Sequence, residues 1–339
     1  MTAGDSLLHR AHSGDGQAFA ELVEPHRREL HVHCYRMLGS FDDADDAVQE
    51  TLLAAWRGLA TFQAKASIRT WLYRVATNTC LNLLRTATRR PQMALTLPPT
   101  APAPTGSEKV TWLQPYPDAL LDGLPDDDLG PDARVEQNEA VSLAFITALQ
   151  LLSPRSRAVL ILRDVLGFSA REVAGTLDST EDAVAMTLSR ARASLRDKAH
   201  PSVPPPEPAG RPVEATLARR LAAAFTAHDV DTVVSLLAED VRIAMPPLPA
   251  VWEGRQRAAE FLAEVAFRLV PQARFIQTRA NRQPALAVYA RDDTSGLWHG
   301  SGLLVITVRG DQVAALTRFE SHTLRAFGLP RILPDDDPG

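Results

Sequence analysis

The sequence has few cysteines and no long apolar run, and both absences exclude classes of protein. Its two cysteines, Cys34 and Cys80, belong to no set of Cys and His residues at metal-ligand spacing. This excludes a disulfide framework, gives no metal site and suits a reducing compartment. No stretch approaches the roughly 20 apolar residues of a membrane span, and the first residues have no apolar core of signal-peptide length. We therefore expect a cytoplasmic protein without a membrane partner.

Proline is concentrated in two stretches that divide the chain. Residues 91–135 contain PPTAPAPTGSE, and residues 201–212 read PSVPPPEPAGRP, both without sustained periodicity. Such composition is typical of extended or disordered linkers. The 339 residues therefore divide into compact blocks at 5–90, 136–200 and 213–330, each long enough to bury a core of its own.

Acidic residues gather at the start of one helix in the first block. The segment from Asp42 to Trp56 reads DDADDAVQETLLAAW. Its apolar residues follow the helical i, i+3, i+4, i+7 pattern and predict one buried stripe: Ala44, Ala47, Val48, Thr51, Leu52, Ala55 and Trp56. The acids must then lie on the exposed face. Asp42 and Asp43 are explained by the positive end of the helix dipole, but Glu50 lies too far into the helix for that.

The acidic segment is followed directly by a basic one. No Asp or Glu occurs from Thr51 to Arg90. In a helix that begins near Ser67, the predicted core stripe contains Ile68, Trp71, Leu72, Val75, Ala76, Thr79 and Leu83. A neighbouring face carries basic, amide and aromatic side chains: Arg69, Tyr73, Arg74, Asn78 and Arg85. Arginine binds phosphates, asparagine binds base edges and tyrosine stacks on unpaired bases, so this face predicts contact with nucleic acid.

The second block has the pattern of a helix-turn-helix. Ser153 before Pro154 predicts a helix start, Ser169 with Glu172 forms a capping box, and a tight turn at Asp178 leads into a long last helix. In that helix Val184, Leu188, Ala191 and Leu195 are predicted to point inward. The outward face offers Glu181, Ala185, Met186, Ser189, Arg190, Arg192 and Arg196 to DNA. A plain three-helix bundle with a basic surface stays open at this point.

The third block is predicted to contain strands as well as helices, unlike the first two. The segment LARRLAAAFTAHDVDTVVSLLAEDVRIAMPP predicts a helix, a short helix after Asp229 and a strand, and GRQRAAEFLAEVAF predicts another helix after a turn at Gly254. LAVYAR, GLLVITVRG and DQVAALTRFES then predict strands, the last two joined by a tight turn at Gly310. Helices followed by a curved antiparallel sheet indicate an α+β domain.

Together these motifs resemble bacterial RNA polymerase sigma factors of the extracytoplasmic-function (ECF) group. The resemblance rests on HCYRMLGSFDDADDAVQETLLAAWRGL, FQAKASIRTWLYRVATNTCLNLLR and LSPRSRAVLILRDVLGFSAREVAGTL with SRARASLR. It implies two all-α domains, sigma region 2 at 5–90 and sigma region 4 at 136–200, joined by the linker at 91–135. The third block resembles the SnoaL-like cone in DVRIAMPPLPAVWEGRQRAAEFL and VAALTRFES, which implies a regulatory α+β domain after the linker at 201–212.

The resemblance also assigns roles to residues. Docking on core RNA polymerase falls to Asp45, Asp46, Gln49 and Glu50. Capture of the melted −10 promoter strand falls to Arg69, Tyr73, Arg74 and Asn78, with Arg85 on the same basic face. Reading of the −35 element falls to Arg190 and Arg192, with Glu181 and Ser189 as weaker candidates. Ala185, Met186 and Thr187 stand where many members have two basic residues and a serine, which predicts fewer phosphate contacts and a salt-sensitive dependence on the remaining arginines.

For the third block the implied pocket has candidate residues at its mouth: Trp252, His299, Arg318 and His322. The interpretations left open are a docking surface that regulates the sigma domains by intramolecular contact, a ligand sensor, and a small-molecule isomerase or cyclase. We expect a non-enzymatic sigma factor without a cofactor, whose partners are core RNA polymerase and promoter DNA. The alternatives are the enzyme and a DNA-binding regulator that acts without polymerase.

Overall fold

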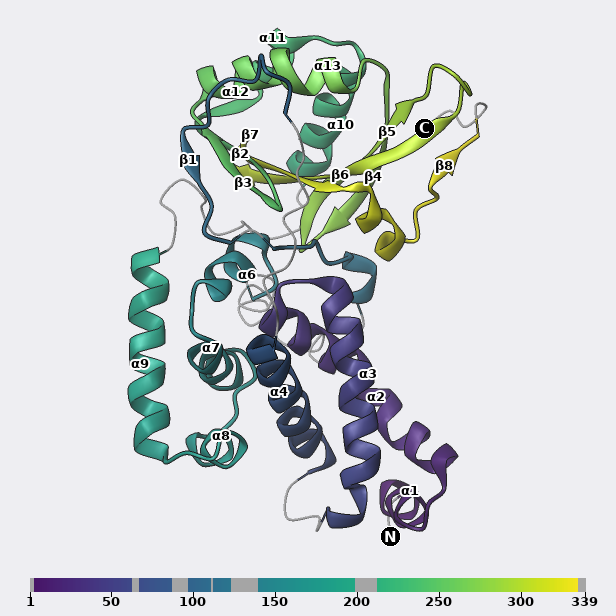
Figure 1. Ribbon diagram of the computed structural model, residues 1–339, viewed down its shortest axis with the longest axis vertical. Coiled ribbons are helices and arrows are strands. Elements are labelled where there is room, and N and C mark those ends of the chain that lie inside the picture. Colours follow the sequence, from purple (N-terminus) through teal and green to yellow (C-terminus); the bar gives the residue numbers. More distant parts are fainter. Residues whose placement is uncertain are drawn as a thin grey trace. The chain divides into compact units, whose positions relative to one another are not determined.

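The computed structural model describes residues 3–62, 67–86, 97–110, 112–122, 140–198 and 212–334. These residues divide into two compact units (Figure 1). The first comprises the described residues up to 86 together with 152–198, and the second comprises 97–122, 140–151 and 212–334. Within these ranges, no helix has the length and apolarity needed to cross a membrane.

The first unit opens with a group of packed helices. They are α1 (Ala3–His12), α2 (Gly16–Leu38), α3 (Phe41–Gly58), the 3-10 turn η1 (Leu59–Thr61) and α4 (Ile68–Thr86). Asp15 caps α2 by accepting a hydrogen bond from the Ala18 amide at 3.0 Å. Gly39 ends the helix at φ 73°, a conformation that favours glycine, and Ser40 caps α3. Helices α2, α3 and α4 pack on one another, as the sequence predicts for an all-α domain.

The buried faces of α3 and α4 correct two of the predictions. In α3 the predicted stripe is buried at Ala44, Ala47, Val48, Thr51 and Ala55. The prediction is wrong for Trp56, which is 37% exposed and packs its ring on Phe19 at a centroid distance of 5.2 Å. In α4 the buried residues are Leu72, Tyr73, Ala76, Thr77 and Cys80. Tyr73 was expected on the polar face and is buried instead, because its ring packs against His33 and Phe168. Its hydroxyl donates a hydrogen bond to the buried Glu29 carboxylate of α2.

The helix-turn-helix prediction is confirmed. Its helices are α7 (Pro154–Leu160), continued by the π-helical turn η3 (Ile161–Val165), then α8 (Ala170–Thr176) and α9 (Glu181–Lys198). Ser153 caps α7 with Pro154 in the first turn, and Ser169 with Glu172 forms both hydrogen bonds of the capping box. Asp178 takes the left-handed conformation at φ 45° in the turn before α9.

The second unit contains one sheet. Its strands are β1 (Gly106–Ser107), β2 (Leu237–Met245), β3 (Leu248–Glu253), β4 (Ala273–Ala280), β5 (Gln283–Arg291), β6 (Trp298–Arg309), β7 (Gln312–Glu320) and β8 (Ile332–Leu333). The order is β1-β3-β2-β7-β6-β5-β4, and β8 pairs with β6. The predicted tight turn is confirmed, since β6 and β7 pair up to Arg309 and Gln312 around Gly310. The prediction of an antiparallel sheet is wrong for one pair: β2 and β7 run parallel, which makes the sheet mixed.

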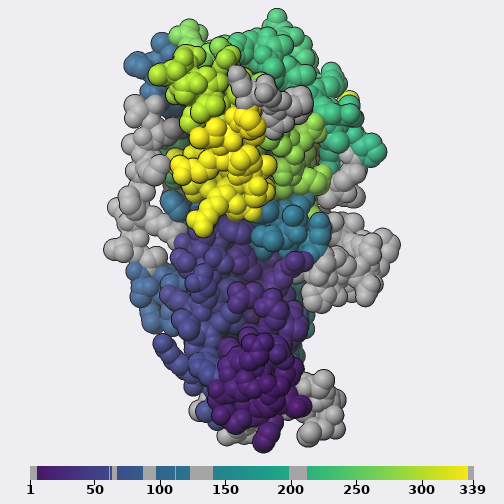
Figure 2. Space-filling model, turned by 90° about the vertical axis from the view of Figure 1, so that its right-hand side faces the viewer, coloured from purple at the N-terminus to yellow at the C-terminus, as the bar shows by residue number. Residues whose placement is uncertain are grey.

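Helices cover this sheet and bury its apolar side chains. They are α10 (Pro212–Thr226), α11 (Val230–Ser235), α12 (Arg255–Phe261), the π-helical turn η4 (Leu262–Ala266) and α13 (Phe267–Leu269). Helix α6 (Leu143–Gln150) belongs to the same unit. Helix α10 packs against β4 and β5, and α12 packs against β2 and β3. The core between them contains Leu221, Trp252, Phe261 and Ile306. After β7, the 3-10 turn η5 (Ser321–Phe327) and β8 lie at the surface of this unit (Figure 2, yellow).

The part of the linker at residues 97–122 is ordered, which corrects the prediction of an extended or disordered segment. Strand β1 pairs with the sheet edge at β3, with Gly106 opposite Val251. A 3-10 turn, η2 (Asp118–Leu120), follows. Composition misled the prediction because proline is well tolerated on a sheet edge and in turns, where its missing N–H costs nothing. Residues 91–96, 111 and 123–139 lie outside the described residues, as do residues 201–211 of the second linker.

Candidate functional site

Helix α3 presents an exposed group of acidic and amide side chains. Asp45, Asp46, Gln49 and Glu50 are all exposed. Gln49 donates a hydrogen bond to the Asp45 carboxylate at 3.2 Å, one turn earlier. Within the described ranges, none of the carboxylates of Asp45, Asp46 and Glu50 forms an ion pair. The helix therefore presents fixed negative charge to an outside partner.

An apolar side chain accompanies this charge and was missed in the sequence. Leu53 is 56% exposed and lies one turn after Gln49 and Glu50 on the same helix. Its position off the core stripe is the signal that could have found it. A large exposed aliphatic side chain next to unpaired carboxylates gives the surface both an apolar and an electrostatic means of recognition.

On α4, two of the predicted strand-capturing residues are held by a buried carboxylate. Glu29 accepts hydrogen bonds from Arg69 Nε at 2.8 Å and from the Tyr73 hydroxyl at 3.1 Å. Its other oxygen pairs with His26 Nδ1 at 2.6 Å. Burial raises the pKa of Glu29, but the hydrogen bonds from His26 and Arg69 outweigh it, and the net pKa lies below the usual value. Glu29 is thus ionised and fixes Arg69 and Tyr73.

The same two residues contact the helix-turn-helix. The Tyr73 ring meets Phe168 edge-on at a centroid distance of 5.4 Å, and the Arg69 guanidinium lies 6.0 Å from the Phe168 ring centre. Nearby, the buried Arg157 of α7 donates a hydrogen bond to the Met37 carbonyl at the end of α2. The unit is therefore joined by packing as well as by hydrogen bonds, and Tyr73 has no open face.

The remaining residues of the basic face are more accessible. Arg74 is 51% exposed, and its guanidinium lies 3.9 Å from Asp178, at the edge of an ion pair. Asn78 is half-buried and has no hydrogen-bond partner within the described residues. Arg85 is exposed and donates to Asn82 at 3.1 Å. These three side chains can reach a nucleic acid without rearrangement of the core.

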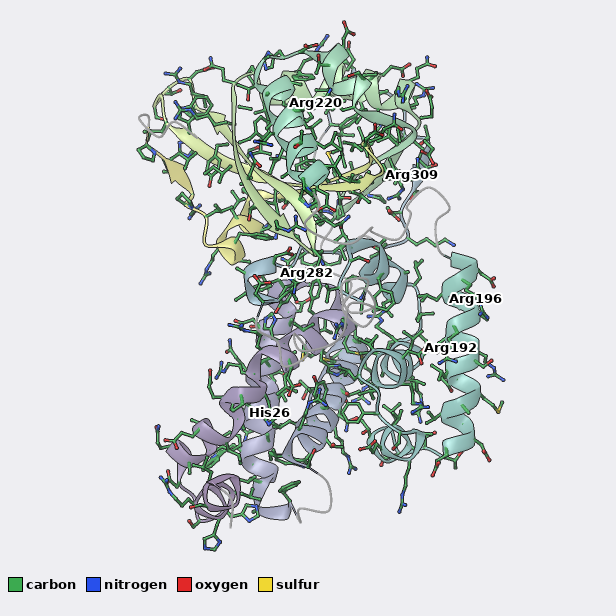
Figure 3. All side chains as sticks on the ribbon, turned by 180° about the vertical axis from the view of Figure 1, so that it is seen from behind. His26, Arg192, Arg196, Arg220, Arg282 and Arg309 are labelled. Carbon is green, nitrogen blue, oxygen red and sulfur yellow. The ribbon has the colours of Figure 1, made fainter. Side chains whose placement is uncertain are left out.

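The outward face of α9 is exposed as predicted, but Arg190 and Arg192 differ in whether they form an ion pair. Glu181, Ser189 and Arg190 are exposed, and Arg190 has no ion pair within the described part of the chain. Arg192 forms two hydrogen bonds with Asp164, from Nε at 2.8 Å and from Nη2 at 2.7 Å. These bonds raise the pKa of Arg192. Arg192 and Arg196 both project from α9 in Figure 3. Arg192 thus braces α9 against η3, the turn that continues α7.

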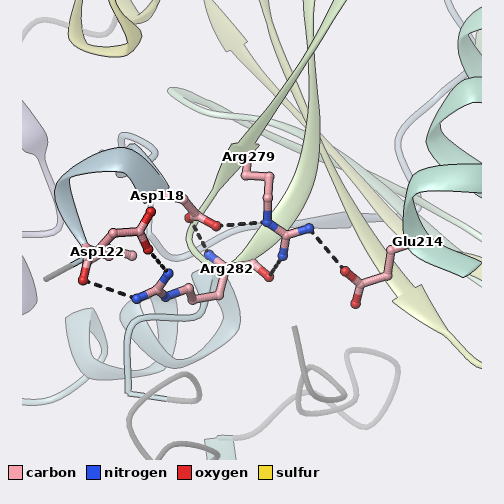
Figure 4. A network of polar contacts seen from close by, with 6 residues as sticks. Asp118, Asp122, Glu214, Arg279 and Arg282 are labelled. Atoms are coloured by element: carbon pink, nitrogen blue, oxygen red, sulfur yellow. Dashed lines mark hydrogen bonds and ion pairs between the residues drawn. The ribbon is translucent and has the colours of Figure 1, made fainter. Parts of the chain in front are cut away.

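In the second unit, buried charges attach the linker to the sheet (Figure 4). Asp118 of η2 accepts hydrogen bonds from Arg279 Nε at 3.1 Å and from the Arg282 amide at 2.7 Å. Arg279 also reaches Glu214 of α10 at 3.3 Å, and Arg282 pairs with Asp122 at 2.7 Å. Two arginines at the turn between β4 and β5 therefore hold both ends of η2.

Asn281 joins two separate segments of the chain at this turn. Its side-chain oxygen accepts from the Tyr116 amide at 2.8 Å, and its nitrogen donates to the Val141 carbonyl at 2.7 Å. Asn281 is fully buried with φ 55°, a left-handed conformation that asparagine tolerates better than most residues. Elsewhere along the linker, Trp252 Nε1 donates to the Pro102 carbonyl at 2.9 Å, and Glu108 pairs with Arg242.

The C-terminal domain also contains a cavity of ≈ 190 Å³. Of the predicted pocket residues, Arg318 lines this cavity, whereas Trp252, His299 and His322 do not. Trp252 is fully buried against the linker, and His299 and His322 are exposed. His322 Nε2 lies 3.1 Å from the Gln114 side chain. In the described ranges, no group of three or more His, Cys, Asp and Glu residues could hold a metal ion.

Three segments of the chain match known protein families. Residues 22–90 match the Sigma-70 region 2 family, residues 142–195 match Sigma-70, region 4, and residues 218–330 match the SnoaL-like domain. The ECF RNA polymerase sigma factor SigG of Mycobacterium tuberculosis is 40% identical over 321 residues, which cover 92% of this chain and 84% of SigG. The chain belongs to the ECF sigma factors. This sigma factor directs transcription initiation at specific promoters and is a transcription factor of the RNA polymerase machinery.

Other relatives of this sigma factor cover it to different extents. SigM of Mycobacterium tuberculosis is 31% identical over 192 residues, which cover 56% of this chain and 82% of SigM. The crystal structure of the Mycobacterium tuberculosis extracytoplasmic function sigma factor SigJ superposes with a TM-score of 0.59 at 24% identity, and covers 90% of this chain and 97% of that one. The SigJ likeness supports the fold of the sigma factor: helical sigma domains followed by a SnoaL-like domain.

Proposed function

We propose that Asp45, Asp46, Gln49 and Glu50 form the surface by which this sigma factor binds core RNA polymerase. The observation that supports this is the exposed charge of Asp45, Asp46 and Glu50, which form no ion pair within the described ranges, with Leu53 beside them. Because these carboxylates form no ion pair within the described residues, no such pair has to be broken before they bind a partner. Their charge also steers association with a basic surface.

Transcription in vitro with core enzyme tests this proposal. The variant Asp45→Asn/Asp46→Asn/Glu50→Gln keeps the shape of α3 and removes its charge. We expect promoter-dependent transcripts to fall at least about tenfold, because each charge pair at an interface contributes on the order of 1 kcal/mol or more. Glu24→Gln is the matched control, since Glu24 is an exposed acid of α2 in the same unit.

Binding of the triple variant to promoter DNA separates the competing functions. Loss of transcripts with intact DNA binding supports the docking role. Unchanged transcription in the triple variant would refute it. If the native protein binds promoter DNA but gives no transcript with core enzyme, it is a regulator that acts without polymerase.

For promoter DNA we propose two surfaces. On α4, Arg74, Asn78 and Arg85 receive the −10 strand, and Arg69 and Tyr73 join them only after they leave Glu29 and Phe168. On α9, Glu181, Ser189 and Arg190 face the −35 element, and Arg192 reaches DNA by exchanging the Asp164 carboxylate for a phosphate. The exposure of Arg74, Arg85 and Arg190 supports them as residues of the first contact, and the only ion pair that they form within the described residues is the long one from Arg74 to Asp178. Arg69 and Arg192 are held by short ion pairs and are the ones that rearrange.

The SnoaL-like domain, we propose, modulates the sigma factor through the linker and has no enzymatic activity. The segment 97–122 lies in the chain between the region 2 and region 4 matches, and hydrogen bonds tie it to the C-terminal domain. The polar groups of the cavity lining are Ser301 and Arg318, which lack the paired acid and base of an isomerase or cyclase. The family supports action in the cytoplasm, where core polymerase works.

A further inference from the structure

The cavity of the SnoaL-like domain is apolar on nearly all sides. It lies between the sheet and α10, η4 and α13, and its lining includes Phe225, Val265, Phe275 and Leu304. Leu269 of α13 lines it as well and is 52% exposed, so the cavity approaches the surface there. A cavity of about 150 Å³ is enough to hold benzene. The ≈ 190 Å³ of this one suits an organic molecule somewhat larger than a single ring.

One cation lies in this apolar lining. Arg318 of β7 donates from Nη2 to the carbonyl and to the hydroxyl of Ser301, both at 2.9 Å. Within the described residues it forms no ion pair, and Glu320, two residues further along β7, lies 3.6 Å from His322. Burial lowers the pKa of Arg318, an effect that the charge of Glu320 opposes. A largely buried cation without a paired anion is costly, and the cost falls when an anion binds beside it.

The guanidinium of Arg318 lies against the neighbouring strand β6. A Cβ at Gly302 of β6 would overlap the Phe319 carbonyl oxygen and lie 3.4 Å from the guanidinium carbon of Arg318. The overlap with the Phe319 carbonyl explains the glycine, and the 3.4 Å approach places the guanidinium in van der Waals contact with β6 at this residue. The cation is therefore a built part of the cavity wall.

We propose that this cavity binds a small apolar carboxylate, whose carboxylate accepts hydrogen bonds from Arg318 and whose hydrocarbon part lies among the aromatic and aliphatic side chains. A neutral ligand of the same size leaves the cation unpaired, and an amine is repelled by it. Guanidinium and carboxylate form the stronger, charge-assisted type of hydrogen bond. The proposal goes beyond the transcriptional role of the chain, and it is measured without polymerase or DNA.

Calorimetric titration of the full-length protein tests the proposal with matched ligands. The probes are hexanoate, octanoate, decanoate and 3-phenylpropanoate, with octan-1-ol and octylamine as controls of equal length. We expect at least one carboxylate to bind at one site per chain and to raise the melting temperature. Octan-1-ol should bind at least about tenfold more weakly than octanoate, and octylamine more weakly still.

Substitution of the cation identifies the site. Arg318→Met keeps an unbranched side chain and removes the charge, so carboxylate affinity should fall to that of octan-1-ol. Arg325→Met is the control, because Arg325 is an exposed arginine of the same domain that does not line the cavity. Leu269→Glu is a second test that spares the core, because Leu269 is half-exposed; it places a negative charge at the cavity and should weaken carboxylates more than octan-1-ol.

The proposal is overturned by any of three results. They are no saturable binding of any of the four carboxylates at millimolar concentration, carboxylates that bind no tighter than the alcohol, and native carboxylate affinity in Arg318→Met.

Discussion

Arg190 and Arg192 are two positions apart in α9 and have different surroundings. Arg190 is exposed without an ion pair in the described part of the chain, whereas Arg192 is held by both oxygens of Asp164. Helical periodicity predicted both as outward, and it could not reveal the brace, because Asp164 lies in the π-helical turn of another helix. The distinction bears on how strongly each arginine contributes to DNA binding.

We expect Arg190→Ala to weaken binding to a promoter duplex about tenfold, with a smaller salt dependence, because a phosphate contact is lost. Arg192→Ala should weaken it less than about threefold, since Asp164 already engages that guanidinium. Fluorescence anisotropy at several salt concentrations measures both. A larger loss for Arg192→Ala than for Arg190→Ala would show that the ion pair opens on DNA at little cost.

His33 is a second residue whose chemistry depends on packing. It is fully buried on α2, its Nε2 lies 3.0 Å from the Thr77 hydroxyl, and Tyr73 packs on its ring. Burial, helped by the charge of Arg36 and opposed by that of Glu29, lowers the pKa of His33 to about 3. The folded protein therefore keeps His33 neutral at a pH where the unfolded chain protonates it.

This difference predicts a loss of stability in acid. Because the folded pKa lies below the unfolded value of 6.5, the contribution is present in full above pH 6.5 and declines as the pH falls toward 3. Between pH 7 and pH 5, we expect native protein to lose about 2 kcal/mol more unfolding free energy than His33→Gln. Urea denaturation at both pH values measures this difference. The pKa of His31 is also lowered, to about 4, but His31 is present in the native protein and in His33→Gln, so its contribution cancels in the comparison. Equal losses in the two proteins would contradict the assignment.

At the scale of elements, the regular parts of the fold were predictable and the linker was not. Periodicity and capping residues predicted α3, α7, α8 and α9, and alternation predicted β5, β6 and β7, because these signals are local. The ordering of residues 97–122 depends on partners more than a hundred positions later, such as Arg279 and Asn281. No local pattern carries that information, and the proline content favours the opposite conclusion.

Release of this segment is predicted for Asp118→Ala. The change leaves the Arg282 amide without its acceptor and removes one of the two carboxylates that hold Arg279, which should cost about 2 kcal/mol. Hydrogen exchange should then speed up at residues 97–122 while α2 and α3 keep their protection. Asp122→Ala is the control, because its carboxylate is exposed and its pair with Arg282 contributes little. Unchanged exchange at 97–122 would show that β1 and Asn281 suffice to hold the segment.

At the scale of the whole molecule, the assignment to the sigma family and the order of the domains were predictable, whereas the surroundings of the site residues were not. Asp45, Asp46 and Glu50 of α3 are exposed as expected, because the amphipathic pattern of the helix alone determines this. Tyr73 is buried and Trp252 does not reach the cavity, because both depend on long-range packing. The periodicity of the sequence predicts which face of a helix or strand is exposed, whereas the residues that pack against that face are known only from the folded structure.

A chain that ends near His200 tests the role of the C-terminal domain. It lacks Asn281, Arg279 and the β3 edge, so its linker exposes Tyr116 and other apolar groups that the domain otherwise buries. We expect its transcription with core enzyme to differ at least about threefold from that of the full chain, and Asn281→Ala to shift activity in the same direction. Equal activity of all three proteins would exclude modulation through the linker.

The separation between Asp118 and Arg279 also has a consequence for synthesis. The two residues are 161 positions apart. Because chains grow at about 5–20 residues per second, Arg279 is synthesised roughly 8 to 30 s after Asp118. Helices α2, α3 and α4 are complete long before then. The acidic helix of the nascent chain is therefore complete while residues 97–122 still lack the surface of the C-terminal domain that covers them in the finished protein.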